Sequence, residues 1–180
     1  MNFNQNYFEL FDLGESFQLD VEDLGVRYRR LQKKIHPDRF ANASEQEKRV
    51  SLQYTVLANE AYKTLKNPVA RASYLLALSG CEKSDGNDNG SVDVEFLTLQ
   101  MELREALEDI GTMGDLDEAL SQIDHLRKKV LSMEAALQQE FNQAFIASKL
   151  EDAGKRVQEM QYIEKLLAEI GKVEERILDY

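Results

Sequence analysis

The sequence is poor in the residues that build several common kinds of site. It has one cysteine, Cys81, among 180 residues, so it can form neither an internal disulfide nor a cysteine-based metal site. It has no run of eighteen apolar residues, so no transmembrane helix is predicted. The segment Met1–Leu10 lacks the basic start and apolar stretch of a secretory signal, and it is not arginine-rich like a mitochondrial presequence. We therefore expect a cytoplasmic protein that does not act at a membrane.

Negative charge is concentrated in the second half of the chain. Residues 1–80 hold 11 basic and 10 acidic side chains, whereas residues 81–180 hold 11 basic and 23 acidic ones. The formal net charge is −11. A strongly acidic half argues against nucleic acid as the main ligand.

The positive charge of the first half gathers in one predicted helix over residues 20–35. Its apolar residues follow steps of four, three and four: Leu24, Tyr28, Leu31 and Ile35. Asp20 is the predicted N-cap. Five cations stand within eight residues: Arg27, Arg29, Arg30, Lys33 and Lys34. Because these charges repel one another, a cationic face kept at that cost indicates an acidic partner surface.

A rigid corner follows this helix. Pro37 disfavours a helical conformation at His36 and has no backbone N–H, so the helix should end here. Ser44 and Glu47 form a predicted capping box that opens a second helix. That helix has one apolar stripe and ends at Asn67-Pro68; the stripe is Val50, Tyr54, Leu57, Ala61 and Leu65. The two stripes predict an antiparallel hairpin with the corner at its tip.

The tripeptide His36-Pro37-Asp38 by itself fits an ordinary loop. An acid–base role for His36 and Asp38 has poor support, because no nucleophile or third orienting group stands nearby. The only other histidine, His125, has no paired ligand at the i+4 position and fits a surface residue. We therefore predict no catalytic residue.

Residues 81–93 are polar and rich in Gly, Asn, Asp and Ser, and they predict a linker. Asp85, Asn87 and Asn89 alternate as in a calcium loop, but no glutamate stands at the required offset. Calcium binding is therefore not expected.

Three helices are predicted after the linker, over residues 94–110, 115–148 and 151–178. The short connection between the last two favours an antiparallel hairpin within a three-helix bundle. A coiled-coil dimer is the alternative, although Gly154 and Gly171 in the last helix argue mildly against a long autonomous coil.

The predicted helix over 94–110 carries two apolar residues that do not fit its core stripe. The core stripe is Phe96, Leu99, Leu103, Leu107 and Ile110. At ~100° per residue, Leu97 and Met101 fall on the opposite side, beside Arg104, Glu105 and Glu108. Apolar residues among charges fit a contact patch. Isolated surface apolar residues are also normal, or another helix could cover them. The pattern alone leaves both interpretations open.

The first half of the chain resembles a J domain over roughly residues 5 to 80. The resemblance rests on an ordered set of motifs: Tyr28-Arg29-Arg30-Leu31, His36-Pro37-Asp38-Arg39-Phe40, Asn59 to Leu65, and Asn67-Pro68 with Arg71 and Tyr74. It implies a helical domain that stimulates ATP hydrolysis by DnaK-like chaperones, with Asp38 as the key acceptor. The implied docking residues are Arg27, Tyr28, Arg29, Arg30, Lys33, Lys34, His36, Pro37, Asp38 and Arg39.

With the second half included, the chain is similar to the HscB family, co-chaperones of iron–sulfur cluster assembly. Phe96-Leu97, the run Met101 to Glu105 and the ending Ile177 to Tyr180 carry this resemblance. It implies that an apolar patch rimmed by charge binds the cluster scaffold protein. The implied patch is Leu97, Thr98, Met101, Glu102, Glu105 and Tyr162.

Several features depart from the family pattern. Arg39 stands where lysine is common, and the two side chains are not equivalent at a tight contact. Thr98 is less apolar than the residue often found there, which weakens the patch. The cysteine pairs of eukaryotic relatives are absent near the N-terminus, so no metal or other cofactor of its own is expected.

The expectation is an all-α protein with a J domain over 1–80, a linker over 81–93 and a scaffold-binding helical domain over 94–180. It would activate a DnaK-like ATPase of the HscA type and deliver a scaffold protein of the IscU type, without covalent chemistry of its own. Two rivals remain: a general J-protein whose bundle binds another client or dimerises, and an enzyme that uses His36, Asp38 or His125.

Overall fold

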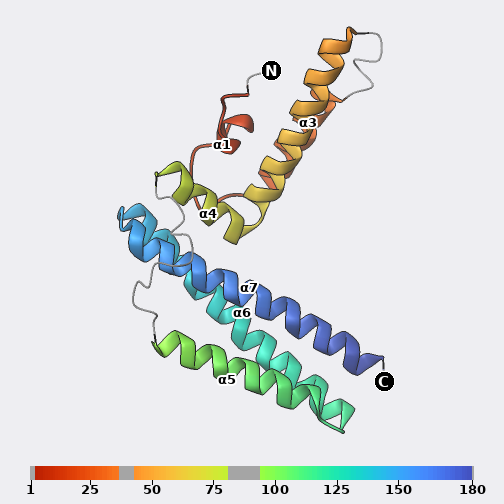
Figure 1. Ribbon diagram of the computed structural model, residues 1–180, viewed down its shortest axis with the longest axis vertical. Coiled ribbons are helices and arrows are strands. Elements are labelled where there is room, and N and C mark those ends of the chain that lie inside the picture. The colour runs from red at the N-terminus through yellow and green to blue at the C-terminus, as the bar shows by residue number, and fades with distance from the viewer. Residues whose placement is uncertain (1–2, 37–42, 81–93, 180) are drawn as a thin grey trace. The chain divides into compact units, whose positions relative to one another are not determined.

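The computed structural model describes residues 3–36, 43–80 and 94–179, and all regular secondary structure in these ranges is helical (Figure 1). The all-α prediction is confirmed. The chain divides into two compact units, Met1–Ser79 and Gly80–Tyr180. The predicted linker over 81–93 lies outside the described residues, and so do Pro37, Asp38 and Arg39.

The first unit is built on an antiparallel hairpin of α2 (Val21–Ile35) and α3 (Glu45–Lys66). The predicted caps are present: Asp20 accepts from the backbone N–H groups of Glu22 and Asp23, and Ser44 and Glu47 form the capping box. Near the tip, the Ser51 hydroxyl donates to the Ile35 carbonyl at 2.6 Å. The predicted antiparallel hairpin is thus present. In α3 the buried residues are Ser51, Tyr54, Ala58, Ala61 and Leu65, whereas Val50 and Leu57 of the predicted stripe are half-buried.

Two short helices complete this unit, α1 (Tyr7–Leu10) and α4 (Pro68–Leu78). The Tyr7 and Tyr74 rings stack with centroids 4.3 Å apart, and the Tyr7 N–H donates to the Tyr74 hydroxyl. Arg71 is buried at 5% exposure, where it donates to the Leu65 carbonyl at 2.6 Å and lies over the Phe17 ring. Arg71 therefore ties α4 to the end of α3 and to the segment before α2.

The second unit is a three-helix bundle of α5 (Val94–Gly111), α6 (Leu116–Ile146) and α7 (Leu150–Leu178). Arg127 pairs with Glu174 and Arg156 with Glu140, so α6 and α7 run antiparallel after their short connection. The core contains these fully buried side chains: Leu103, Ile123, Val130, Phe141, Met160, Ile163, Leu166 and Ile170. The bundle prediction is confirmed, and α6 ends at Ile146, two residues before the predicted end.

Candidate functional site

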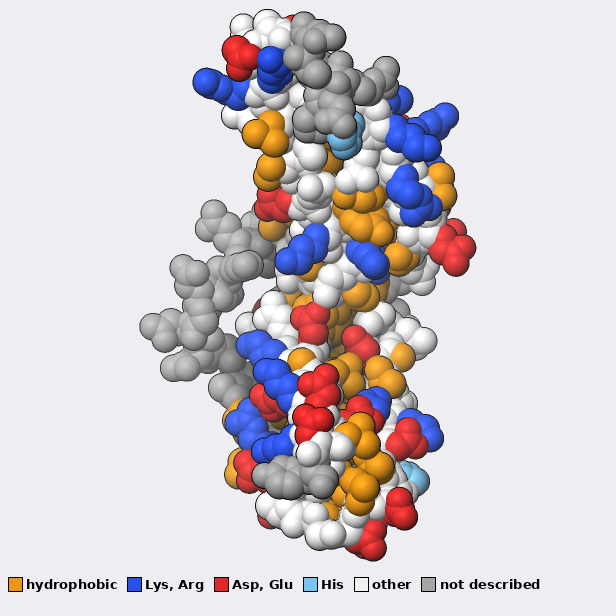
Figure 2. Space-filling view, turned by 90° about the vertical axis from the view of Figure 1, so that its right-hand side faces the viewer, with side chains coloured by type: hydrophobic (Ala, Val, Ile, Leu, Met, Phe, Trp, Pro, Cys, Tyr) orange, Lys and Arg blue, Asp and Glu red, His pale blue; other side chains and the backbone are white. Residues whose placement is uncertain are grey.

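The outer face of α2 carries the predicted docking cations. Arg29, Arg30, Lys33 and Lys34 are exposed, on the side opposite the buried Leu24 and Ile35. Figure 2 shows Lys and Arg side chains gathered on a face of the first unit, with hydrophobic side chains between them. Lys33 and Lys34 also stand in the last turn, where positive charge complements the helix dipole.

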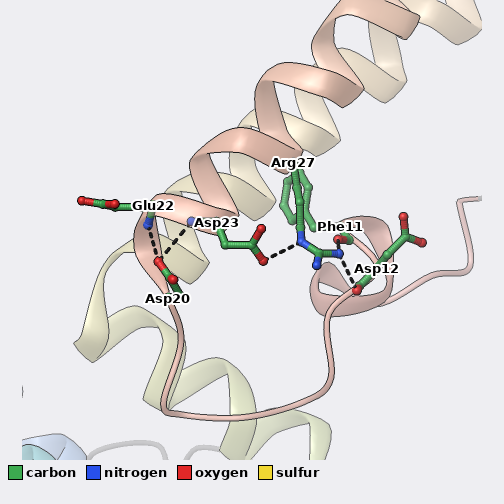
Figure 3. A network of polar contacts seen from close by, with 6 residues as sticks. All are labelled: Phe11, Asp12, Asp20, Glu22, Asp23 and Arg27. Carbon is green, nitrogen blue, oxygen red and sulfur yellow. Dashed lines mark hydrogen bonds and ion pairs between the residues drawn. The ribbon is translucent and has the colours of Figure 1, made fainter.

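Arg27 is placed differently from the other cations. Its Nε donates to the Asp23 carboxylate at 2.7 Å, and its Nη1 donates to the carbonyls of Phe11 and Asp12 at 3.1 and 2.8 Å (Figure 3). Asp12 has a positive φ of 55°, which marks the sharp turn after α1. Arg27 therefore fixes this turn against α2, a structural task that its place in the sequence does not reveal.

Tyr28 braces the hairpin. Its ring stacks on Tyr62 of α3 with centroids 4.1 Å apart, and its hydroxyl donates to Asn59 at 2.8 Å. The Gln32 side chain donates to the same hydroxyl. A partner that docks on α2 would thus meet Tyr28 as part of a rigid wall between the two helices.

His36 closes α2 as its C-cap residue, with φ −56° and ψ 131°, outside the helical region, and its side chain is exposed. The neighbouring Ile35 is buried, and its carbonyl is held by Ser51. The chain thus leaves the helix at a fixed point, with the exposed cations one turn away.

The second candidate surface lies on α5. Leu97 is 43% exposed and Met101 74% exposed, while Thr98, Glu102 and Glu105 are exposed around them. Within the second unit, these fractions exclude the interpretation in which another helix buries the two apolar side chains. The Thr98 hydroxyl donates back to the Val94 carbonyl at 2.9 Å, so its hydrogen is used within the helix.

Tyr162 reaches this helix from α7. Its hydroxyl donates to the Gln100 carbonyl at 3.0 Å, and its ring meets the Phe96 ring edge-on at 5.7 Å. Burial raises the pKa of Tyr162, and the nearby charge of Arg104 opposes that rise. Tyr162 is half-buried, and these contacts place it against Phe96 and Gln100, the neighbours in sequence of Leu97 and Met101.

Val94 is an apolar residue of this surface that sequence reasoning did not assign to it. It is 73% exposed and precedes Leu97 and Met101 at i, i+3 and i+7 spacing, so all three share one face of α5. This spacing is the sequence pattern by which Val94 can be assigned to the same surface as Leu97 and Met101. The apolar strip is therefore one turn longer than predicted, and the exposed carboxylates of Glu102 and Glu105 flank it.

Other kinds of site are not found in the described ranges. They contain no group of three or more His, Cys, Asp or Glu side chains that could hold a metal ion. None of their helices combines the length and apolarity needed to cross a membrane. His125 is exposed, and its Nδ1 lies 2.9 Å from the Ser121 carbonyl, as expected of a surface histidine.

The chain resembles known proteins over almost its whole length. A family model described as the HSCB C-terminal oligomerisation domain matches residues 92–171. A co-chaperone protein HscB homolog of Shewanella loihica is 42% identical over 175 residues, which is 96% of this chain and 99% of that protein. A homolog of the same name from Vibrio parahaemolyticus is 42% identical over 174 residues, again 96% and 99% of the two chains.

Solved structures agree. The chaperone HscB from Vibrio cholerae matches with a TM-score of 0.85 at 36% identity, covering 96% of this chain and 99% of that one. The human co-chaperone protein HscB matches with the same TM-score at 30% identity, covering 96% and 83%. This chain belongs to the HscB family of co-chaperones.

Proposed function

We propose that this protein is an adaptor with two docking sites. Its J domain stimulates the ATPase of a specialised DnaK-like chaperone of the HscA type. Its C-terminal bundle delivers an iron–sulfur scaffold protein of the IscU type to that chaperone, for iron–sulfur protein maturation in the cytoplasm. The observation that carries this proposal is that each unit exposes one surface suited to docking, cationic on α2 and apolar with an acidic rim on α5.

The proposed chaperone site is an electrostatic one. Exposed cations on a rigid helix steer an acidic surface of the ATPase into place and set its orientation. Asp38 then accepts a hydrogen bond from a partner arginine or backbone N–H, a charge-assisted bond of the stronger kind. The site comprises Arg27, Tyr28, Arg29, Arg30, Lys33, Lys34, His36, Pro37, Asp38 and Arg39.

The proposed scaffold site is an apolar one. Leu97 and Met101 together offer a surface that a partner can cover, and burial of such side chains is worth about 25 cal/mol per Å². Glu102 and Glu105 on the rim favour a scaffold face with neutral or positive charge. The site comprises Leu97, Thr98, Met101, Glu102, Glu105 and Tyr162.

The adaptor needs no covalent chemistry. Holding scaffold and ATPase on one chain raises the effective concentration of one at the other. ATP hydrolysis by the partner would then trap the scaffold in the chaperone. The protein is thus an activator of a partner ATPase and not an enzyme.

The test is steady-state ATP hydrolysis by an HscA-type chaperone, with this protein and with or without the IscU-type scaffold. Asp38→Asn should abolish stimulation. The double variant Leu97→Ala/Met101→Ala should remove only the part that depends on the scaffold. If stimulation is unaffected by the scaffold and by the patch variant, the protein is a J-protein with another client. If the protein stimulates no DnaK-like chaperone, the proposal is refuted.

A further inference from the structure

A groove of about 490 Å³ lies between the outer face of α2 and the turn that follows α1. Its apolar lining residues are Leu10, Phe11, Val26 and Leu31, of which Leu10 and Phe11 are buried, Leu31 is half-buried and Val26 is exposed; all five predicted docking cations of α2 border it. The groove therefore combines an apolar lining with a cationic border. Such a combination calls for a partner that offers both apolar and negatively charged groups.

Packing within the first unit does not explain why the groove residue Val26 is aliphatic. It is 55% exposed and lies on the α2 face of Arg30 and Lys33, at i, i+4 and i+7 spacing. This face is opposite the buried Leu24 and Ile35, so Val26 is not one of the buried residues of the core. Valine is also a poorer helix former than lysine, arginine or glutamate. A partner side chain in the groove would account for an aliphatic residue at this position.

Both walls of the groove are held in place before any partner arrives. The Arg27 guanidinium ties the carbonyls of Phe11 and Asp12 to α2 (Figure 3). The Leu13 N–H donates to the Phe8 carbonyl at 3.0 Å, which fixes the far side of the same turn. Phe11 is 2% exposed and meets the Tyr28 ring edge-on. A preformed groove avoids the cost of ordering the chain on binding.

Charge changes along the groove. Asp12 and Asp23 line it at the start of α2, where Arg27 engages the Asp23 carboxylate. Arg30, Lys33 and Lys34 line it toward the end of α2. Val26 and Lys33 are seven residues apart in a helix, about 10 Å along its axis. An extended chain covers that distance in about three residues.

We propose that this groove takes an extended segment of the partner ATPase in which an aliphatic side chain stands within about three residues of a carboxylate pair. The aliphatic side chain contacts Val26, and the carboxylates meet Arg30, Lys33 and Lys34. This inference rests on the proposed docking of the ATPase and adds to it an apolar anchor. Docking on α2 is then set by shape as well as by charge.

The test titrates the full-length protein against an HscA-type chaperone and records the concentration that gives half-maximal stimulation, along with the maximal rate. Val26→Lys should raise the half-maximal concentration about tenfold, although it adds a cation to a cationic face, because it removes the apolar contact. Val26→Ile should stay within about twofold of wild type, because its side chain remains aliphatic.

The matched control is Val56→Lys. Val56 is 59% exposed on α3 and does not line this groove. Val56→Lys therefore makes the same substitution at a similarly exposed position outside the groove. It should leave the half-maximal concentration within about twofold of wild type. Thermal unfolding should be unchanged in both lysine variants, because neither valine is part of the core.

Each outcome has one meaning. If Val26→Lys docks as well as wild type or better, docking on α2 is purely electrostatic and the groove proposal is wrong. It is equally wrong if Val26→Lys and Val56→Lys weaken docking alike. If wild type stimulates no chaperone, the proposed function itself fails and the groove proposal fails with it.

A second measurement needs no substitution. The methyl resonances of Val26 in the wild-type protein should shift when the chaperone is added, and those of Val56 should not. An unshifted Val26 in a protein that stimulates the chaperone would overturn the proposal even if Val26→Lys failed to fold.

Discussion

The two candidate surfaces lie on helices that differ in how they are packed against the rest of their units. α2 is fixed along its length, by the Asp20 cap, the Arg27 contacts, the Tyr28 stack and the bond from Ser51 to Ile35. α5 is held mainly by its second half, since its buried residues are Leu103, Leu107 and Ile110. Its first half, which carries Leu97 and Met101, is joined to α7 through Tyr162.

This difference matches the kind of contact each surface would make. Charge acts at a distance and guides orientation, so a cationic face gains from a rigid mount. An apolar patch gains most from close fit, and a helix segment with few buried contacts can open or shift at low cost. α2 is thus held along its whole length, whereas the start of α5 is held mainly through Tyr162.

The largest effect is expected at Arg71, in the first unit. Arg71→Ala leaves the Leu65 carbonyl without its buried donor and removes the guanidinium from the Phe17 ring. It should lower the free energy of unfolding of the first unit by about 3 kcal/mol, measured by urea denaturation. Arg71→Met keeps most of the side-chain volume and should cost about half as much; equal losses would show that the hydrogen bond and not packing is decisive.

The next largest effect is expected at Tyr162, in the second unit, where it contacts the first half of α5. Tyr162→Ala removes the ring that meets Phe96 and the hydroxyl that donates to Gln100, and should cost about 2 kcal/mol. Amide hydrogen exchange should then speed up over residues 94–101 far more than over residues 103–110. Tyr162→Phe keeps the ring and should cost about 1 kcal/mol. Uniform acceleration along α5 would contradict the two-part description of this helix.

A smaller effect separates the roles of two cations on α2. Arg27→Ala removes donors to two carbonyls and to Asp23; because this side chain is partly exposed, the loss of unfolding free energy should be only about 1 kcal/mol. Arg30→Ala, at an exposed position, should leave the free energy of unfolding within about 0.5 kcal/mol of wild type.

For chaperone docking the order of the two variants should be the opposite: Arg30→Ala should have the larger effect and Arg27→Ala the smaller. Arg30→Ala should weaken chaperone docking and reduce its sensitivity to salt, because an exposed charge acts through a screened field. Arg27→Ala should change the salt sensitivity less. If Arg27→Ala flattened the salt dependence as much as Arg30→Ala does, Arg27 would contribute to docking through its charge as much as the exposed cations do, and not mainly by holding the turn after α1 against α2.

The features predictable from sequence were those that depend on neighbours along the chain. The Asp20 cap and the Ser44–Glu47 capping box need only a few adjacent residues, and both are present. The outward placement of Leu97 and Met101 follows from helical periodicity, and their exposure agrees.

The features that escaped prediction depend on partners far along the chain. Arg27 binds carbonyls 15 and 16 residues away, which periodicity cannot detect, so it was grouped with the exposed cations. Tyr162 was assigned to the patch only through the family resemblance, because its Gln100 partner is 62 residues away. The burial of Arg71 likewise needed the packing of α4 against the end of α3.

The most gradual effect concerns alkaline pH, which should act on both units. Burial raises the pKa values of Tyr7 and Tyr74 in the first unit and of Tyr162 in the second, above the usual value near 10. Below about pH 10 these tyrosines are protonated in the folded and unfolded chain alike, so their ionisation does not affect stability. Above it, the unfolded chain releases its protons first, and the free energy of unfolding falls as pH rises.

Each such tyrosine can contribute a slope of at most about 1.4 kcal/mol per pH unit in this range. Urea denaturation at a series of pH values should give a shallower alkaline slope for Tyr162→Phe in the second unit and for Tyr74→Phe in the first. Tyr74→Phe also removes the acceptor of the Tyr7 N–H, so its stability is offset at every pH, and only the slope reports ionisation. Slopes equal to that of wild type in both variants would mean that the alkaline loss comes from general charge repulsion in this acidic chain, and the two units would then not differ in this respect.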